Sequence, residues 1–320
     1  MECGLLVGDG PFRHLTVEEA EAYDGPGFLW LHLHGRDETD LAFLKRQPDL
    51  PHVAASALVA TETRPRCDRI EFGAIVNLRG PGDNDPDDSD RLVSIRLWIH
   101  DNRVISLSRR RMSATAEVMR KFEAGKIHDP GDLVAAYAVM IALELDPQVA
   151  GLGDTLDDIE TDLEQTQSLY RHRTAITRSR SEAISFRRFV APDRDALMTL
   201  AGLDVDWLGD DDRLHIREAA DKFARMAEEL EAVRERAALL HEQITDLRAE
   251  QLDQRSLQIA LVAFIFLPLT FITGLLGMNV EGIPYANRPW AFWGVVAFCL
   301  AVAVAVWVYT LWRFGFRDRN

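Results

Sequence analysis

Two long apolar stretches near the C-terminus decide the fold. Residues 257–276 read LQIALVAFIFLPLTFITGLL, and residues 290–312 read WAFWGVVAFCLAVAVAVWVYTLW. Neither stretch contains Asp, Glu, Lys or Arg, and each has about the length that an α-helix needs to cross the hydrocarbon core of a bilayer. Tyrosine and tryptophan lie near the ends of the second stretch, as amphipathic rings do at headgroup level. The sequence therefore predicts an integral membrane protein with two transmembrane helices.

The charges that flank these spans predict the orientation. Basic residues precede the first span and follow the second, whereas the connecting loop, residues 280–289, holds one: they are Arg248 and Arg255, then Arg313, Arg317 and Arg319, against Arg288. Basic residues favour the cytoplasmic side. The first fifteen residues contain charges and a proline, so we expect no signal peptide. We therefore expect a bacterial-type inner membrane protein with both termini in the cytoplasm and residues 313–320 as a cytoplasmic tail.

The part of the chain before the spans is strongly acidic. The formal net charge is −15, and residues 256–320 contribute +2, so the preceding residues carry −17. Such a surface repels nucleic acid and attracts cations, so we expect no nucleic acid as a partner, although most of these carboxylates also fit a charge that simply keeps the domain soluble. The three cysteines, Cys3, Cys67 and Cys299, are too far apart in the sequence for a zinc knuckle or a redox motif.

Residues 1–125 have the pattern of a cytoplasmic α/β domain. Candidate strands lie at residues 27–33, 70–78, 92–100 and 104–108, with helical patterns between and after them. The Asp-rich segment 80–90 lacks the central glycine and the closing glutamate of a calcium loop, so we expect a solvated hairpin loop there. Residues 126–212 form a helical region, which we expect to be interrupted near Pro147, residues 151–153 and Pro192.

A single helix is predicted from residue 213 into the first span. Residues 213–267 contain neither Gly nor Pro, so nothing ends a helix before Pro268. We expect a stalk that continues as a transmembrane helix over about residues 256–276 and ends in the segment 277–279. One face carries a heptad seam that must pack against other helices: Ile216, Ala219, Phe223, Met226, Leu230, Val233, Ala237, Leu240, Ile244 and Leu247.

The face roughly opposite is small or polar as often as it is apolar, and we call it the candidate pore face. Its residues recur every three or four positions: Glu242, Thr245, Ala249, Leu252, Ser256, Ile259, Ala263, Leu267 and Thr270. This pattern suits a bundle of helices around a water-filled centre, although contact with lipid or with a neighbouring helix would also explain it. Two spans cannot enclose an aqueous path by themselves, so a pore requires several subunits.

The first span leads into Gly277-Met278-Asn279. Gly277 allows the backbone to leave the helix at the membrane boundary, and Asn279 then offers a neutral carbonyl oxygen. A ring of such oxygens suits a cation that keeps its water shell, whereas a ring of carboxylates would hold a divalent ion too tightly for release.

This tripeptide between two spans, preceded by a long helix, resembles the CorA superfamily of divalent metal ion transporters, and the resemblance covers essentially the whole chain. It implies a cytoplasmic αβα domain, a stalk helix, two transmembrane helices and a homopentamer. It also implies an ion-selectivity filter at Gly277, Met278 and Asn279, with Asn279 facing the hydrated cation. The resemblance places a hydroxyl ring inside the pore at Thr270.

Within the superfamily, the chain is similar to the ZntB-type zinc transporter branch. The similarity is carried by TRPR at residues 63–66, LRG at 78–80, SIRLW at 94–98 and VEGIP at 280–284. It implies zinc uptake, with protons as a candidate coupling ion. Glu281 departs from the glycine that we expect after the filter; it would add negative charge at the pore mouth or face the solvent.

Further candidate residues lie outside the spans. Neither span contains Asp, Glu, His, Lys or Arg, so a proton-coupling group would lie outside the bilayer, and Glu242 is the candidate. His32 and His34 alternate on a predicted strand and share a face that could hold zinc, although they also fit ordinary core or surface histidines. We find no phosphate-binding glycine loop, nucleophile elbow or metalloprotease helix, so we expect neither an enzyme nor a bound cofactor.

Two other functions stay open at this point. A magnesium or cobalt channel of the same superfamily would have the same architecture. A membrane-tethered sensor or scaffold would use the spans only as an anchor, so replacement of Asn279 would leave it unaffected.

Overall fold

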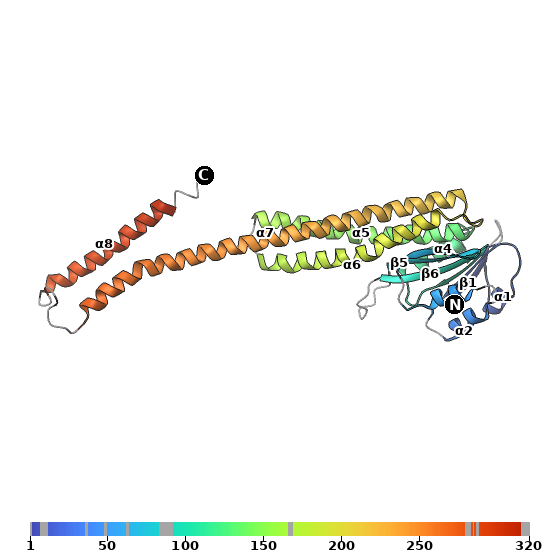
Figure 1. The fold of residues 1–320 in the computed structure, drawn as a ribbon, viewed down its shortest axis with the longest axis horizontal. Helices are drawn as coiled ribbons and strands as arrows, with labels where there is room; N and C mark the ends of the chain where they lie inside the picture. The colour runs from blue at the N-terminus through green and yellow to red at the C-terminus, as the bar shows by residue number, and fades with distance from the viewer. Residues whose placement is uncertain are drawn as a thin grey trace. The chain divides into compact units, whose positions relative to one another are not determined.

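The computed structural model describes residues 2–6, 12–35, 38–47, 50–61, 64–82, 92–165, 169–278, 283, 285 and 288–314. The chain forms two compact units, Met1–Glu242 and Gln243–Asn320. The first unit holds a seven-stranded sheet and most of the helices, and the second holds two apolar helical segments (Figure 1). Within the first unit the sheet and the helices after it pack together, so the boundaries near residues 125 and 212 stay predictions.

The sheet is mixed, with strand order β2-β1-β3-β7-β6-β5-β4. Only β3 and β7 pair in parallel among the described strands; the other neighbours are antiparallel. The strands are β1 (Glu2–Leu6), β2 (Arg13–His14), β3 (Phe28–Leu33), β4 (Arg66–Ile70), β5 (Gly73–Pro81), β6 (Leu92–His100) and β7 (Arg103–Leu107).

The four strands expected from the sequence are present as β3, β5, β6 and β7. The candidate at residues 70–78 is wrong at its start, because Glu71 adopts a positive φ of 52° in a turn that separates β4 from β5. The sequence did not predict β1, β2 and β4. In β4 the exposed charges of Arg66, Asp68 and Arg69 mask the strand pattern. The hairpin loop expected at residues 80–90 lies largely outside the described residues.

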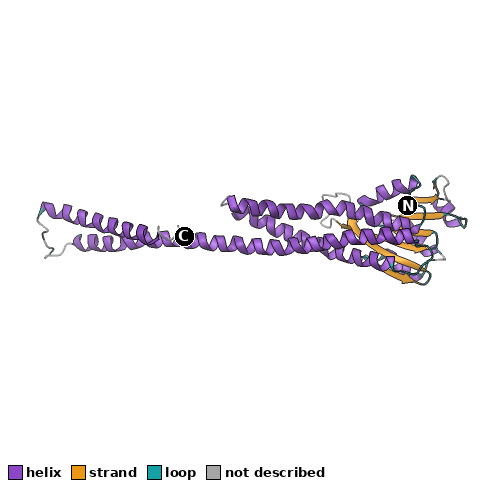
Figure 2. Ribbon diagram, turned by 90° about the horizontal axis from the view of Figure 1, so that it is seen from above, coloured by secondary structure: helices purple, strands orange, loops and turns teal. Residues whose placement is uncertain are grey.

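Helices cover both faces of the sheet, as the αβα prediction requires (Figures 1 and 2). On one face α1 (Val17–Ala22), α2 (Glu38–Arg46) and α3 (His52–Val59) bury an apolar cluster against β3, β6 and β7. On the other face α4 (Ser113–Glu123) and α5 (Pro130–Gln165) meet Trp30, whose ring lies 5.4 Å from that of Phe122 and 6.1 Å from that of Tyr137. Burial of these large side chains supplies the main driving force for the domain.

The interruptions expected near Pro147, residues 151–153 and Pro192 are wrong. Pro147 lies inside α5, and Pro192 lies inside α6 (Leu169–Ala201). A proline removes one helical hydrogen bond and crowds a carbonyl group. In α5 the buried Leu145, Val149 and Leu152 flank Pro147 on both sides, so tertiary packing holds the helix together.

The long helix α7 runs from Asp210 to Leu276, over 67 residues, and passes through Pro268. Its heptad seam is buried from Ile216 to Ile244, as predicted. Leu247, the last residue of the predicted seam, is 38% exposed in a single chain, so its place in the seam stays a prediction. Ion pairs also tie α7 to α5 and α6: Arg236 meets Asp157 and Glu160, and the Arg187 Nε lies 3.1 Å from a Glu231 carboxylate oxygen.

Among the described residues, three helices are long and apolar enough to cross a membrane. Two correspond to the predicted spans, in α7 and in α8 (Pro289–Phe314), and their most apolar windows contain no buried residues. The third is α5, half of whose window is buried inside the first unit. The apolar residues of α5 are explained by the domain core, so the segments in α7 and α8 remain as the candidate spans.

Candidate functional site

The end of α7 is closed by the glycine of the tripeptide. The backbone N–H of Gly277 donates to the carbonyl oxygens of Thr273 (2.9 Å) and Gly274 (3.2 Å). A Cβ atom at position 277 would lie 3.1 Å from the Thr273 oxygen, which is tighter than ordinary contact. Glycine therefore fits this turn, and Met278 follows with its side chain half exposed. Asn279 and Glu281 lie outside the described residues.

Two hydroxyl groups lie within the last turns of the first span. The Oγ1 of Thr270 donates to the carbonyl of Phe266 (2.7 Å), and the Oγ1 of Thr273 donates to that of Leu269 (3.0 Å). These bonds satisfy the hydroxyl protons inside an apolar segment. The oxygen lone pairs of Thr270 stay available to accept hydrogen bonds from water, which is what a hydroxyl ring around a hydrated ion would need.

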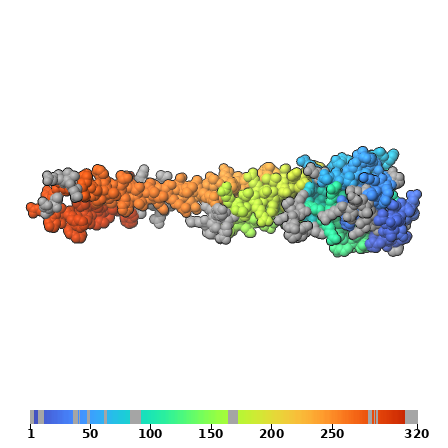
Figure 3. Space-filling model, turned by 90° about the horizontal axis from the view of Figure 1, so that it is seen from below, coloured from blue at the N-terminus to red at the C-terminus, as the bar shows by residue number. Residues whose placement is uncertain are grey.

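The candidate pore face is exposed along the membrane part of α7. Leu252, Ile259 and Leu267 are 60%, 71% and 73% exposed, and Ser256, Ala263 and Thr270 are also exposed. In the space-filling view the side chains of α7 and α8 form the surface of the second unit (Figure 3). By helical geometry these residues lie on one side of α7. Glu242, at the end of the first unit, is also exposed.

The other side of the same segment is partly covered. Half-buried residues recur on α7 at Leu261, Ile265, Leu269 and Ile272, and on α8 at Ala291, Val295, Cys299, Val302 and Val306. Steps of three and four residues define one stripe on each helix, as expected where two helices pack. By helical geometry the stripe on α7 lies opposite the candidate pore face. The second unit thus has a packing side and an open side.

His32 and His34 share a face, as predicted, with ring centroids 5.4 Å apart. His32 is buried, and burial together with the nearby His34 lowers its pKa to about 3. Its Nδ1 lies 2.8 Å from the Ser106 hydroxyl, and its Nε2 lies 3.4 Å from that of Ser108. Both ring nitrogens therefore have protein partners, which favours the core-histidine interpretation over a zinc ligand.

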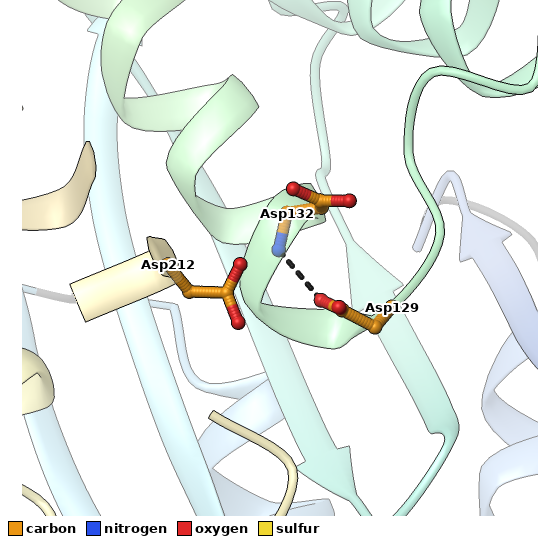
Figure 4. Close-up of side chains that lie close together, drawn as sticks. All are labelled: Asp129, Asp132 and Asp212. Atoms are coloured by element: carbon orange, nitrogen blue, oxygen red, sulfur yellow. Dashed lines mark hydrogen bonds between the residues drawn. The ribbon is translucent and has the colours of Figure 1, made fainter. Parts of the chain in front are cut away.

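A cluster of three carboxylates lies where α5 and α7 begin (Figure 4). One oxygen from each of Asp129, Asp132 and Asp212 lies within 4.8 Å of the others, and among the described residues this is the one group with three potential ligands for a metal ion. Backbone N–H groups partly satisfy it: that of Asp132 donates to Asp129 (2.9 Å), and that of Gly209 donates to Asp212 (2.8 Å).

Burial makes this cluster costly to ionise. Burial, together with the charges of Asp129 and Asp132, raises the pKa of Asp212 to about 6. Burial also raises the pKa of Asp129. Oxygen ligands at this spacing could hold a divalent cation. Sequence reasoning missed the cluster, although Asp210-Asp211-Asp212 and the Asp129/Asp132 spacing were visible at two helix starts. The two helix N-termini come together only in the folded chain, where Gly131 packs against Asp212.

An αβα domain, a helix of 67 residues that enters an apolar hairpin, and a glycine turn at its end define a membrane protein of the transporter class. A family described as CorA-like Mg2+ transporter protein matches residues 25–310. The chain belongs to this family.

Relatives match nearly the whole chain. The zinc transport protein ZntB of Pectobacterium atrosepticum is 31% identical over 305 residues, which cover 95% of this chain and 92% of that protein. ZntB of Yersinia enterocolitica is 30% identical over 308 residues, or 96% of this chain and 92% of that protein. These matches agree with the similarity to the ZntB branch.

Solved structures agree with the fold. The full-length CmaX protein superposes with a TM-score of 0.83 at 30% identity and covers 98% of both chains. The CorA magnesium transporter from Methanocaldococcus jannaschii gives a TM-score of 0.81 at 17% identity, also over 98% of both chains, and shows the likeness of fold alone.

Proposed function

We propose that this protein transports zinc across the cell membrane, inward, through a central pore. The observation that carries the proposal is the likeness along nearly the full length to relatives named zinc transport proteins. It is supported by two apolar helices with no buried residues in their most apolar windows. The transported cation is the cargo, and the proposal requires no resident cofactor and no enzymatic step.

The pore is formed by several copies of α7, with five as the number that the superfamily resemblance implies. The candidate pore face, from Leu252 through Ser256, Ile259, Ala263 and Leu267 to Thr270, lines the path. In one chain this face is exposed, and by helical geometry the half-buried stripe of α7 lies on the other side of the helix. Backbone groups of the helices stay satisfied within each span, so subunit association can enclose water without exposing unpaired backbone to lipid.

Gly277, Met278 and Asn279 form the outer entrance in this proposal. The glycine turn directs the chain away from the helix axis at the membrane boundary, and the amide of Asn279 faces the hydrated cation. Glu281 adds negative charge at the mouth, which raises the local concentration of cations. Both termini then lie in the cytoplasm. Glu242, exposed and outside the spans, is the candidate group for proton coupling.

Transport by the purified full-length protein in proteoliposomes tests this function. We expect uptake of radioactive zinc above that of empty vesicles, with an imposed pH difference across the membrane changing the rate if protons are coupled. Transport of magnesium alone, without response to pH, would favour the magnesium or cobalt channel, which the family description also supports. A complete lack of ion flux would favour the sensor or scaffold.

Substitution at the filter separates transport from anchoring. Asn279→Ala should lower the zinc flux, because the amide that replaces part of the ion's outer hydration is lost. Asn279→Asp should lower the flux and also the zinc concentration at half-saturation, because a carboxylate ring binds a divalent cation more tightly. Glu281→Gln is the matched control at the mouth, with a smaller loss that high salt abolishes. Unchanged flux in both Asn279 variants would contradict the filter.

A further inference from the structure

Two polar residues lie side by side on neighbouring strands of the buried sheet. Asn77 on β5 and Arg96 on β6 are directly opposite in the antiparallel register. Arg96 in turn pairs with Leu107 of β7, which belongs to the core cluster under α2 and α3. Asn77 and Arg96 are 1% and 3% exposed. They therefore lie inside the layer between the sheet and these helices.

Neither side chain is satisfied by the described protein. Both amide atoms of Asn77, Nδ2 and Oδ1, and the Nε and Nη1 of Arg96 are buried without a hydrogen-bond partner among the residues that the structure describes. Buried polar groups are otherwise almost always paired, and an unpaired buried charge costs several kcal/mol. The guanidinium group and the amide each lack partners, and because the two residues are opposite on neighbouring strands, one bound group is able to serve both.

The surroundings of Arg96 are positive. Burial, together with the charges of Arg109 and Arg79, lowers the pKa of Arg96 to about 10. Arg79 lies two residues beyond Asn77 on the same strand face. Its backbone N–H donates to the Asp193 carboxylate (3.0 Å). Arg109 donates from Nη2 to the carbonyl of Val59 at the end of α3 (2.6 Å). The positive charges of Arg109 and Arg79 act on Arg96 and favour an anion beside its guanidinium group.

The donors and acceptors select the kind of anion. A guanidinium group offers parallel N–H donors that match two oxygens of one oxyanion. The amide of Asn77 needs an acceptor for Nδ2 and also a donor for Oδ1. Hydrogen phosphate supplies both, because it carries P–O and P–OH groups, whereas chloride and acetate ions lack the donor. We infer that Asn77 and Arg96 form a binding site for a phosphate group in the first unit.

Calorimetric titration of sodium phosphate into the full-length protein in detergent, in phosphate-free buffer, tests the site. We expect about one phosphate per chain, and phosphate should raise the unfolding temperature above its value in sodium chloride of equal ionic strength. Arg96→Met should weaken binding by at least about tenfold, since charge-assisted hydrogen bonds are lost. Arg69→Met, at an exposed arginine of β4, is the matched control and should bind phosphate as the wild type does.

The unfolding temperatures of the variants without phosphate provide an independent test of the site. Arg96→Met and Asn77→Leu should unfold at or above the wild-type temperature, because each removes a buried group that has no partner. ATP that binds more tightly than phosphate, with the same dependence on Arg96, would assign the site to a phosphate group carried by a nucleotide. Equal stabilisation by chloride, or strong destabilisation by both substitutions with no phosphate binding, would overturn the inference. The outcome is independent of zinc transport.

Discussion

Asp212 illustrates how a single residue balances capping against burial. Its carboxylate accepts the N–H of Gly209 just before α7, which stabilises the first turn of a helix that begins with three aspartates. The same carboxylate is buried beside Asp129 and Asp132. Burial dominates, and the pKa of Asp212 rises from 3.8 to about 6.

This shift predicts the pH dependence of stability. The folded state holds the proton of Asp212 up to about pH 6, whereas the unfolded state releases it near 3.8. Stability is therefore lost as pH rises between these values, by about 3 kcal/mol from this group, and stays level above them. In Asp212→Asn this loss should disappear, so that the variant gains most at pH 7.5 and little at pH 4. Unfolding temperatures of the full-length protein at both pH values measure the difference.

The exposed neighbour Asp211 supplies the control for that measurement. Asp211→Asn changes the formal charge by the same amount at an exposed position of the same helical turn. The unfolding temperature of this variant should depend on pH in the same way as that of the wild type. A gain at pH 7.5 that is equal in both variants would mean that general charge reduction, rather than burial of Asp212, explains the effect.

Among the elements, α7 has different tasks along its length. Its first part is held in the domain by the buried seam and by ion pairs to α5 and α6. Leu230 is fully buried in this seam, whereas Leu239, on the same helix, is 59% exposed. Leu230→Ala should cost about 2–5 kcal/mol of unfolding free energy because it leaves a cavity. Leu239→Ala should change it by less than about 0.5 kcal/mol, as measured by urea unfolding. Equal losses would contradict the assigned seam.

The membrane part of α7 allows a test of the candidate pore face. Ala263 lies on this face, and Leu261 lies in the half-buried stripe on the other side. In a protein with Cys3 and Cys299 replaced by serine, Ala263→Cys should react with a charged, water-soluble thiol reagent while Leu261→Cys stays unlabelled. The native Cys67 contributes no background, because burial raises its pKa to about 12. Labelling of Leu261→Cys alone would place the water path on the opposite side.

At the scale of the whole molecule, one chain cannot form the proposed conduit. A single hairpin offers one open face, and water along that face would meet lipid on the other sides. We therefore expect native mass spectrometry of the detergent-purified protein to give about five times the 36.1 kDa chain mass. A monomer at all protein concentrations would contradict the pore, and another closed ring size would keep the pore and revise the subunit number.

Much of this molecule is predictable because its signals are local. Each of three patterns predicts one helix independently of the rest of the chain. They are an uncharged stretch of about twenty residues, a heptad seam and a long segment free of Gly and Pro. The spans, the buried seam and β6 at Leu92–His100 were therefore found from the sequence. The filter at Gly277-Met278-Asn279 is also a local motif, and it stays a prediction.

The remaining features depend on partners that are distant in the sequence. Pro147 and Pro192 stay inside helices because tertiary packing on both sides outweighs the lost hydrogen bond. Asp212 meets Asp129 only through the packing of α7 on α5, and Asn77 meets Arg96 only through strand register. Periodicity determined the membrane hairpin and the stalk, whereas only the tertiary structure decided which buried charges lie together, because the energy of a buried charge depends on its neighbours in space rather than in sequence.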